Sequence, residues 1–262
     1  MRFLFVSLIG MIARALGLTL SMSSSALHKD LFGQVNAALS LKAAQQSSHS
    51  GGSWKAQTEW WDEQKGSKLT GVSSSVLTSA AGDVYCQLNG WMGPKYFLPH
   101  MLLTVGQNAA GKYCVTADYV PRGPNAFGSD DTYVATHYGN DVLAWYENAM
   151  TIPGSVVLPP SKSFTARMLR SPVHVSVGDL SLDDATEIST KHVQRWLQWI
   201  SEGKESEARQ RGALNGRDDK LRQFAFKSAI SEAMDKFGAE AARDVAAGMT
   251  GPVAEAYVGG GG

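Results

Sequence analysis

Residues 98–118 read LPHMLLTVGQNAAGKYCVTAD, and the predicted sheet is centred on them. Two apolar runs flank a six-residue polar loop that begins and ends with glycine, a pattern that predicts an antiparallel β-hairpin. With Val105 opposite Lys112, both faces of the hairpin are mostly apolar, which is typical of a central strand pair covered on both sides. The pairs that then share a face include Thr104 with Tyr113, Leu102 with Val115, and His100 with Ala117.

Apolar runs on either side of this hairpin predict the rest of a sheet and its helices. Strands are expected at residues 54–62, 72–78, 84–88 and 173–177, the first of them at an edge. Helices are expected at residues 27–44, 139–150, 163–169, 218–237 and 239–249, and another follows a capping box at Ser181 and Asp184. Residues 45–53 and 203–217 are interpreted as a linker and a solvated loop. Because short turns rather than helical crossovers join the strands, we predict an α+β fold with a mainly antiparallel sheet between helices.

The two ends of the chain differ in composition from its middle. Residues 1–25 combine an apolar stretch with Arg2 and Arg14 and a serine-rich end, and no acidic residue occurs before Asp30. This composition predicts a removable targeting segment, and it leaves open organelle import, the secretory route, or a two-part signal. The apolar run is too short for a comfortable membrane span, so no stable membrane anchor is expected. We expect one domain over residues 26–250 and a flexible glycine-rich tail over residues 251–262.

Composition argues against several functional classes. The 262 residues are 44% hydrophobic and 18% charged, which allows a sizeable core. Twenty-four basic residues balance 24 acidic ones, so a nucleic-acid binder that relies on bulk basicity is not expected. Cys86 and Cys114 are too few for a disulfide framework and have no metal-binding spacing. The sequence contains no G-x-S-x-G, H-E-x-x-H or G-x-G-x-x-G motif, so flavin, nicotinamide and metal sites lack support.

Polar residues cluster after the hairpin, where a ligand site is one interpretation. Arginine offers a planar fork suited to carboxylates, and tyrosine offers a hydroxyl on an apolar ring. The structural alternative is a loop anchor for the aspartate, packing for the tyrosines and a solvated face for the arginines. The residues concerned are Asp118, Arg122, Tyr133, His137, Tyr138, Arg167 and Arg170.

Three ordered motifs give the chain a family resemblance. Residues 118–122 read DYVPR, residues 133–138 read YVATHY, and residues 163–173 read SFTARMLRSPV. In this order the motifs resemble red chlorophyll catabolite reductase. The resemblance implies a three-layer α/β/α sandwich shared with the ferredoxin-dependent bilin reductases. It also implies reduction of an open-chain tetrapyrrole with no bound cofactor, reduced ferredoxin as electron donor, and a chloroplast location reached through an N-terminal transit peptide.

The resemblance also suggests which residues form the site. The family carries a glutamate on the first hairpin strand, where this chain has Thr104, and an aspartate near the late helix, where alignment gives Glu232 or, on a different anchor, Ser228. A threonine cannot supply a carboxyl proton, so our hypothesis takes Glu232 as proton donor and His100 as substitute for the lost acid. The expected substrate-binding residues are Thr104, Asp118, Arg122, Tyr133, Tyr138 and Arg167.

Three functions remain open at this point. The first is ferredoxin-dependent reduction of red chlorophyll catabolite to its fluorescent product. The second is non-catalytic binding of a linear tetrapyrrole, and the third is a bilin reductase with a changed substrate. Because ferredoxins are acidic, Lys162, Arg167 and Arg170 are candidates for a local docking surface. The sequence leaves the oligomeric state open, and a homodimer is one alternative.

Overall fold

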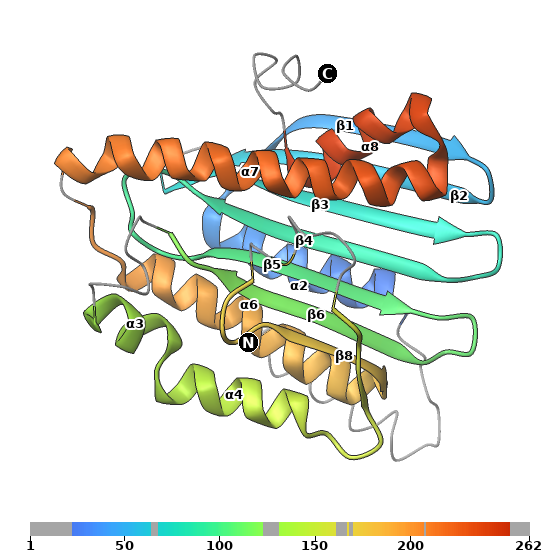
Figure 1. Cartoon of the computed structure of the whole chain (residues 1–262), viewed down its shortest axis with the longest axis horizontal. Helices are drawn as coiled ribbons and strands as arrows, with labels where there is room; N and C mark the ends of the chain where they lie inside the picture. Colours follow the sequence, from blue (N-terminus) through green and yellow to red (C-terminus); the bar gives the residue numbers. More distant parts are fainter. Residues whose placement is uncertain are drawn as a thin grey trace.

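The computed structural model describes residues 23–63, 68–122, 131–160, 167, 170–206 and 208–251. These residues form one eight-stranded sheet with helices on both sides (Figure 1). Every neighbouring pair of strands is antiparallel, in the order β1-β2-β3-β4-β5-β6-β8-β7. The strands are β1 (Leu41–Gly51), β2 (Trp54–Glu63), β3 (Leu69–Ser79), β4 (Val84–Met92), β5 (His100–Gln107), β6 (Tyr113–Val120), β7 (Val156–Val157) and β8 (Val175–Leu180).

Helices form a layer on each side of the sheet (Figure 1). We call the side covered by α2 (Ser24–Leu39) and α6 (Leu182–Glu202) the back face, and α3 (Asp131–Tyr138) and α4 (Asn140–Met150) extend this layer toward β8. On the front face, α8 (Ala239–Thr250) contacts β1, β2 and β3, and α7 (Ala208–Phe237) runs beside it. The α+β class and the three-layer arrangement are therefore confirmed. Among the described residues, no helix has the length and apolar character needed to cross a membrane.

The predicted hairpin exists, but its register differs from the expected one. Val105 lies opposite Val115 rather than Lys112. The difference arises in the turn, where Asn108 and Lys112 close a shorter loop: the Lys112 N–H donates to Asn108 Oδ1 at 2.9 Å, and the Asn108 N–H donates to Lys112 O at 2.9 Å. A shift by an odd number of residues reverses which side chains of β6 share a face with those of β5. Thr104 therefore lies beside Thr116, and Leu102 beside Asp118.

This register separates an apolar face from a polar one, so the expectation of two apolar faces was wrong. The back-face residues of β5 and β6 are almost completely buried against α2 and α6. Gly90 of β4 makes room for Trp196 of α6, because a Cβ atom at this glycine would lie 2.2 Å from the indole ring. The front-face residues are polar or only partly buried except Val120, which packs against Leu221 of α7. The buried back-face residues of the hairpin are Met101, Leu103, Val105, Tyr113, Val115, Ala117 and Tyr119.

Two predicted loops turn out to be regular structure. The first helix ends at Leu39, and residues 41–51, most of which had been interpreted as helix end and linker, form β1. Most of the side chains of β1 are exposed, so no apolar alternation marks the strand in the sequence, and β2 is the second strand rather than the edge. The solvated loop predicted at residues 203–217 is wrong beyond residue 207, because α7 begins at Ala208.

Several local predictions agree with the structure. The capping box at the start of α6 is present. The Asp184 N–H donates a hydrogen bond to Ser181 Oγ, and the Asp184 carboxylate accepts one from the Ser181 N–H. Gly238 separates α7 from α8 with a φ of +78°, a value that favours glycine. Residues 1–22, which make up most of the expected leader, and residues 252–262 of the expected tail lie outside the described residues. The predicted helix at residues 163–169 also lies outside them, except for helical Arg167.

Candidate functional site

A cavity of about 410 Å³ lies on the front face of the sheet, bounded on one side by α7 and α8. We call it the front cavity. Its floor is formed by β4, β5, β6 and β8, and Ala225, Ser228, Ala229 and Glu232 of α7 form a wall. Leu158, Pro159 and Arg170 contribute from the segments around β7 and β8.

The strand register lines up the side chains of the floor in rows that cross the sheet. One row runs from Gln87 through Thr104 and Thr116 to Ser176, because these residues are direct neighbours on four adjacent strands. The hydroxyls of Thr116 and Ser176 lie 3.4 Å apart. All four side chains are neutral and can both donate and accept hydrogen bonds. The floor therefore suits a flat, polar ligand that offers several N–H and C=O groups.

The next row contains a buried acid paired with a histidine. Asp118 is 3% exposed, and its carboxylate accepts hydrogen bonds from Ser171 Oγ and from the Ser171 N–H at 3.1 Å. His174 Nδ1 lies 3.3 Å from the same carboxylate. This contact leaves His174 Nε2, which has no hydrogen-bonding partner among the described residues. The carboxylate orients the ring through Nδ1 and leaves Nε2 as the ring nitrogen available to a ligand in the cavity.

A second buried polar atom also lacks a partner at the cavity. Trp91 lines the front cavity from β4 and is 1% exposed, and no described residue accepts a hydrogen bond from its indole Nε1–H. Buried donors are normally satisfied, and leaving one unpaired costs roughly 1–3 kcal/mol. An acceptor oxygen on a ligand would satisfy this donor.

The wall opposite the floor holds the predicted acid Glu232. Its side chain is 51% exposed and forms an ion pair of 3.1 Å with Lys236, one helical turn along α7. Cys114 lies on the floor, where burial raises the pKa of its thiol and keeps it protonated. The cavity thus has a buried acid–histidine pair on the sheet and a more exposed carboxylate on the helix.

Beyond the cavity, a buried ionic cluster joins the sheet to α7. Arg122 is fully buried and donates through Nε to Asp218 Oδ1 at 2.8 Å and through Nη2 to Asp218 Oδ2. Its other guanidinium contacts are the carbonyl oxygens of Gly93, Tyr96 and Leu98. This pairing fixes the N-terminal part of α7 on the sheet.

His100 belongs to the same cluster. Its Nδ1 accepts a hydrogen bond from the Met92 N–H at 2.9 Å, so the proton is on Nε2, which lies 3.1 Å from Asp218 Oδ1. Burial lowers the pKa of His100, although Asp218 acts in the opposite direction. For Asp218, burial opposes ionisation, but the contacts with His100 and Arg122 outweigh it and lower the pKa. We therefore describe a neutral histidine and an ionised aspartate.

The structure brings together only some of the predicted site residues. Thr104, Asp118 and Glu232 line the front cavity. Arg122 and His100 do not line it but form the ionic cluster. Of the three residues expected to form a docking surface, Arg170 lines the front cavity, Arg167 is exposed, and Lys162 lies outside the described residues.

The two predicted tyrosines lie in the apolar core with the back-face residues. Tyr138 Oη donates to Tyr119 O at 2.7 Å, and Tyr133 Oη accepts from the Arg122 N–H at 3.2 Å. Both hydroxyls therefore bond to the backbone at the end of β6, and neither residue lines the front cavity.

Several cavity residues were missed in the sequence, although a signal for them exists. Polar residues alternate with apolar ones at Gln87 and Asn89 and again at Thr116 and Asp118. His174 and Ser176 occupy the positions between the valines of the last strand, on the face opposite to the apolar one. The polar positions of these alternating segments, considered together with the apolar ones, would have identified the residues of this floor.

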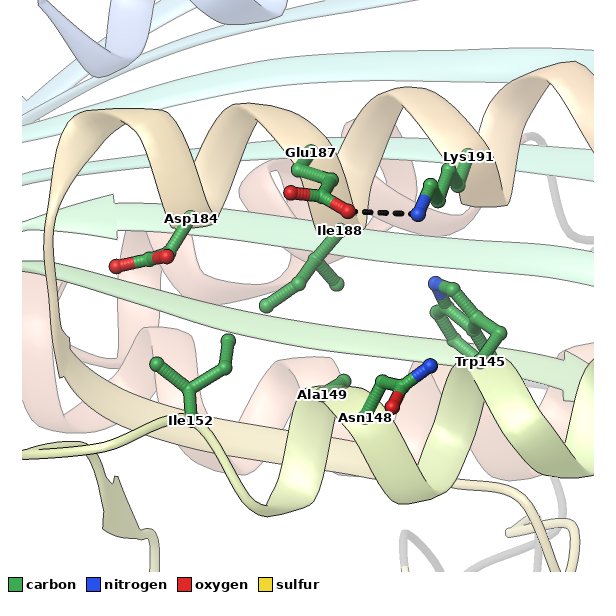
Figure 2. A pocket seen from close by; sticks show the side chains of 8 residues that line it. All are labelled: Trp145, Asn148, Ala149, Ile152, Asp184, Glu187, Ile188 and Lys191. Carbon is green, nitrogen blue, oxygen red and sulfur yellow. Dashed lines mark hydrogen bonds and ion pairs between the residues drawn. The ribbon is translucent and has the colours of Figure 1, made fainter.

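A smaller hollow of about 210 Å³ lies on the other side of the sheet, between α4 and α6 (Figure 2). Trp145, Asn148 and Ile152 come from α4 and its end, and they face Asp184 and Ile188 of α6. Lys191 and Glu187 form an ion pair of 2.6 Å along its upper rim in the figure. Its mixed charges are largely paired, so we place the chemistry in the front cavity. No cluster of three potential metal ligands occurs among the described residues.

Comparisons with known proteins bear on the fold. No family model matches the chain, and no curated protein matches it in sequence. Among solved structures, it is similar to phytochromobilin synthase from tomato in complex with biliverdin. The TM-score is 0.67 at 13% sequence identity, over 87% of this chain and 84% of that one. At this identity the likeness establishes a shared fold.

Proposed function

We propose that the protein is an oxidoreductase that reduces an open-chain tetrapyrrole in the front cavity. The observation that carries the proposal is the Asp118–His174 pair on the floor of a cavity in a fold shared with a biliverdin-bound enzyme. Following the sequence resemblance, the substrate tested first is red chlorophyll catabolite, and the likeness in fold makes biliverdin the second. Reduced ferredoxin is the proposed electron donor.

The lining of the cavity supports this class of substrate. A linear tetrapyrrole presents pyrrole N–H groups and lactam oxygens along a conjugated, mostly apolar plane. The row from Gln87 to Ser176 offers neutral donors and acceptors for that plane, and the Trp91 Nε1–H offers a hydrogen bond to one oxygen. Arg170 at the cavity is suited to a propionate group.

Saturating one double bond of the pigment requires two electrons and two protons. The electrons arrive one at a time from two molecules of reduced ferredoxin, each of which is oxidised. In our proposal, one proton comes from His174 Nε2, while the Asp118 carboxylate stabilises the imidazolium and orients the ring. Glu232, on the opposite wall, supplies the other proton. We thus transfer the role proposed for His100 to His174, because His100 is held in the ionic cluster.

The experiment mixes the protein anaerobically with reduced ferredoxin and either pigment, and follows the absorption spectrum. We expect His174→Phe, Asp118→Asn and Glu232→Gln each to lower the rate by about 10²–10⁴-fold while the pigment still binds. Ser176→Ala, which changes the same floor without removing an acid or base, should stay within about tenfold of the wild type.

Each outcome separates the three functions that the sequence left open. Bleaching of red chlorophyll catabolite to a fluorescent product supports the first, and turnover of biliverdin alone assigns a bilin reductase. A shifted but stable pigment band under reducing conditions would show a binding protein and overturn the catalytic proposal. Full activity of the His174 variant would remove the acid–histidine pair from the mechanism.

A plastid location accompanies this proposal, since ferredoxin and chlorophyll breakdown are found there. A fluorescent protein fused after residue 30 should accumulate in plastids. A fluorescent protein fused to a chain that begins at residue 24, and therefore lacks the expected leader, should remain outside plastids.

A further inference from the structure

The outer side of α7 carries an exposed basic stripe with an aromatic ring at its centre. Lys220, Phe224 and Lys227 follow one another at spacings of four and three residues, so they share one side of the helix. Both lysines are exposed, and Phe224 is 38% exposed. We call these three residues the α7 stripe. Large aromatic side chains in such a position are more common in protein interfaces than on free surfaces.

The charge around the stripe is strongly one-sided although the whole chain is neutral. Residues 211–227 contain five basic residues and two acidic ones. Of the two acids, Asp218 is buried and paired with Arg122, so it offers no negative charge to the surface. Glu205, in the segment before α7, is paired with Arg211 at 2.9 Å. That pair also compensates Arg211, and Asp219 is half-buried like Arg217 and Arg222. The exposed positive charge of this segment therefore comes mainly from Lys220 and Lys227.

The C-terminal end of the same helix is different. There Glu232 and Asp235 accompany Lys236, and α8 adds both signs of charge through Glu240, Arg243 and Asp244. The excess of positive charge is thus confined to the part of α7 that carries the stripe. A local field of this kind attracts an acidic protein and orients it before contact.

The stripe lies directly behind the front cavity. Ala225, Ser228 and Ala229, which alternate with the stripe along α7, line the cavity from the inner side of the helix. A partner on the outer side is therefore separated from the cavity by the thickness of one helix, about 10 Å. Electron tunnelling between redox groups in proteins is fast across such a distance.

We propose that the α7 stripe is the docking surface for an acidic protein that carries single electrons, such as a plant-type [2Fe–2S] ferredoxin. The inference rests on the proposed reductase function. Phe224 forms the apolar centre of the contact, and Lys220 and Lys227 pair with carboxylates of the partner around it. At each encounter the partner loses one electron, the pigment gains it, and two encounters with two protons from the cavity complete one saturated bond.

The test compares a protein donor with a small chemical donor. In Lys220→Glu/Lys227→Glu and in Phe224→Ala, we expect the KM for plant-type ferredoxin to rise at least tenfold, while kcat at saturation stays within about twofold. With dithionite-reduced methyl viologen the same variants should match the wild type, and the spectrum of bound pigment should not change. The matched control is Lys29→Glu/Lys112→Glu, which reverses two exposed lysines on α2 and in the β5–β6 turn.

The outcomes keep this inference separate from the proposed function. If the wild type reduces no pigment with either donor, the reductase function fails, and NMR titration of the protein with ferredoxin still tests the docking surface. An unchanged KM in the stripe variants would overturn the docking proposal. So would an equal loss with both donors, because the residues would then act on the pigment site. The proposal would also be overturned if the NMR signals of the stripe residues shifted on addition of RNA or of a second copy of the chain, but not on addition of ferredoxin.

Discussion

The two faces of the β5–β6 hairpin are built from alternating residues of the same eight-residue strands, yet they have different roles. On the back face, Val115 is completely buried between β5 and β8 and packs in the main core. On the front face, its neighbour Thr116 lies on the floor of a cavity. The back face therefore supplies the apolar burial that stabilises the fold, and the front face is free to carry polar chemistry.

The ionic cluster is the exception to this division, because it is a structural element on the front side. Asp218→Ala leaves the fully buried Arg122 without its counter-ion, and we expect the free energy of unfolding to fall by about 3–5 kcal/mol. Urea denaturation measures this loss. The double variant Arg122→Met/Asp218→Leu should recover a large part of it, because it removes both charges. A loss below 1 kcal/mol in the single variant would show that the cluster does not hold α7 on the sheet.

Reciprocal isosteric substitutions test the two faces most directly. Val115→Thr places a hydroxyl in an apolar layer with no partner, and we expect a loss of about 2 kcal/mol in the free energy of unfolding. The measurement is again chemical denaturation, with Val177→Thr on the adjacent strand as a second example. Equal stability of Val115→Thr and the wild type would contradict the assignment of this face to the core.

Histidines buried behind the sheet should make the fold sensitive to acid. Burial lowers the pKa of His137 to about 4, and its ring packs against Tyr133 and Trp199 at 4.7 and 4.8 Å. Because the unfolded chain binds this proton near pH 6.5, stability is full above that value and declines as the pH falls toward 4. At pH 5.5 the loss from this residue is about 1.4 kcal/mol.

The variant His137→Phe should remove that part of the pH dependence. Unfolding free energies measured at pH 8 and 5.5 should differ less in the variant than in the wild type. An identical pH dependence in the two proteins would show that His137 is not the titrating group. The residual dependence is assigned to the other buried histidines, which are His192, whose pKa burial lowers to about 3, and His28 and His100, whose pKa values burial also lowers.

The smallest effect is expected on the front face itself. Thr116→Val removes a hydroxyl whose hydrogen-bonding partner among the described residues is Ser176, at a long 3.4 Å, so stability should change by less than about 0.5 kcal/mol. Pigment affinity should instead fall by a factor of about five, the value of one modest hydrogen bond. Fluorescence or absorption titration with the pigment measures it. A fall in stability as large as that of Val115→Thr would remove the distinction between the faces.

Much of the fold could be predicted from the sequence, because apolar periodicity marks most of the elements that are buried on one side, although α3 was not predicted. The strands around the hairpin, the capping box of α6 and the late helices were found in this way. Strand β1 could not be found, since its mostly exposed side chains carry no alternation, and its strand geometry comes from pairing with β2. The register of the hairpin was also predicted wrongly, because the side chain of Asn108 determines the turn.

The candidate site was less accessible to prediction. Asp118 was identified, but its partner His174 depends on the pairing of β6 with a strand that follows about 50 residues later. Arg122 was expected to bind a substrate, whereas its carboxylate partner is Asp218, 96 positions along the chain. Residue type and local spacing therefore identify candidate groups, and only the tertiary arrangement decides which of them face a ligand.

The position of β8 at the side of β6 has a consequence for how the protein matures. Asp118 and His174 are 56 positions apart in the chain. Contacts between such distant segments form slowly, since the entropy of closing a long loop opposes them. The acid–histidine pair should thus appear late in folding. Recovery of pigment turnover after dilution from urea is therefore expected to lag behind the recovery of secondary structure.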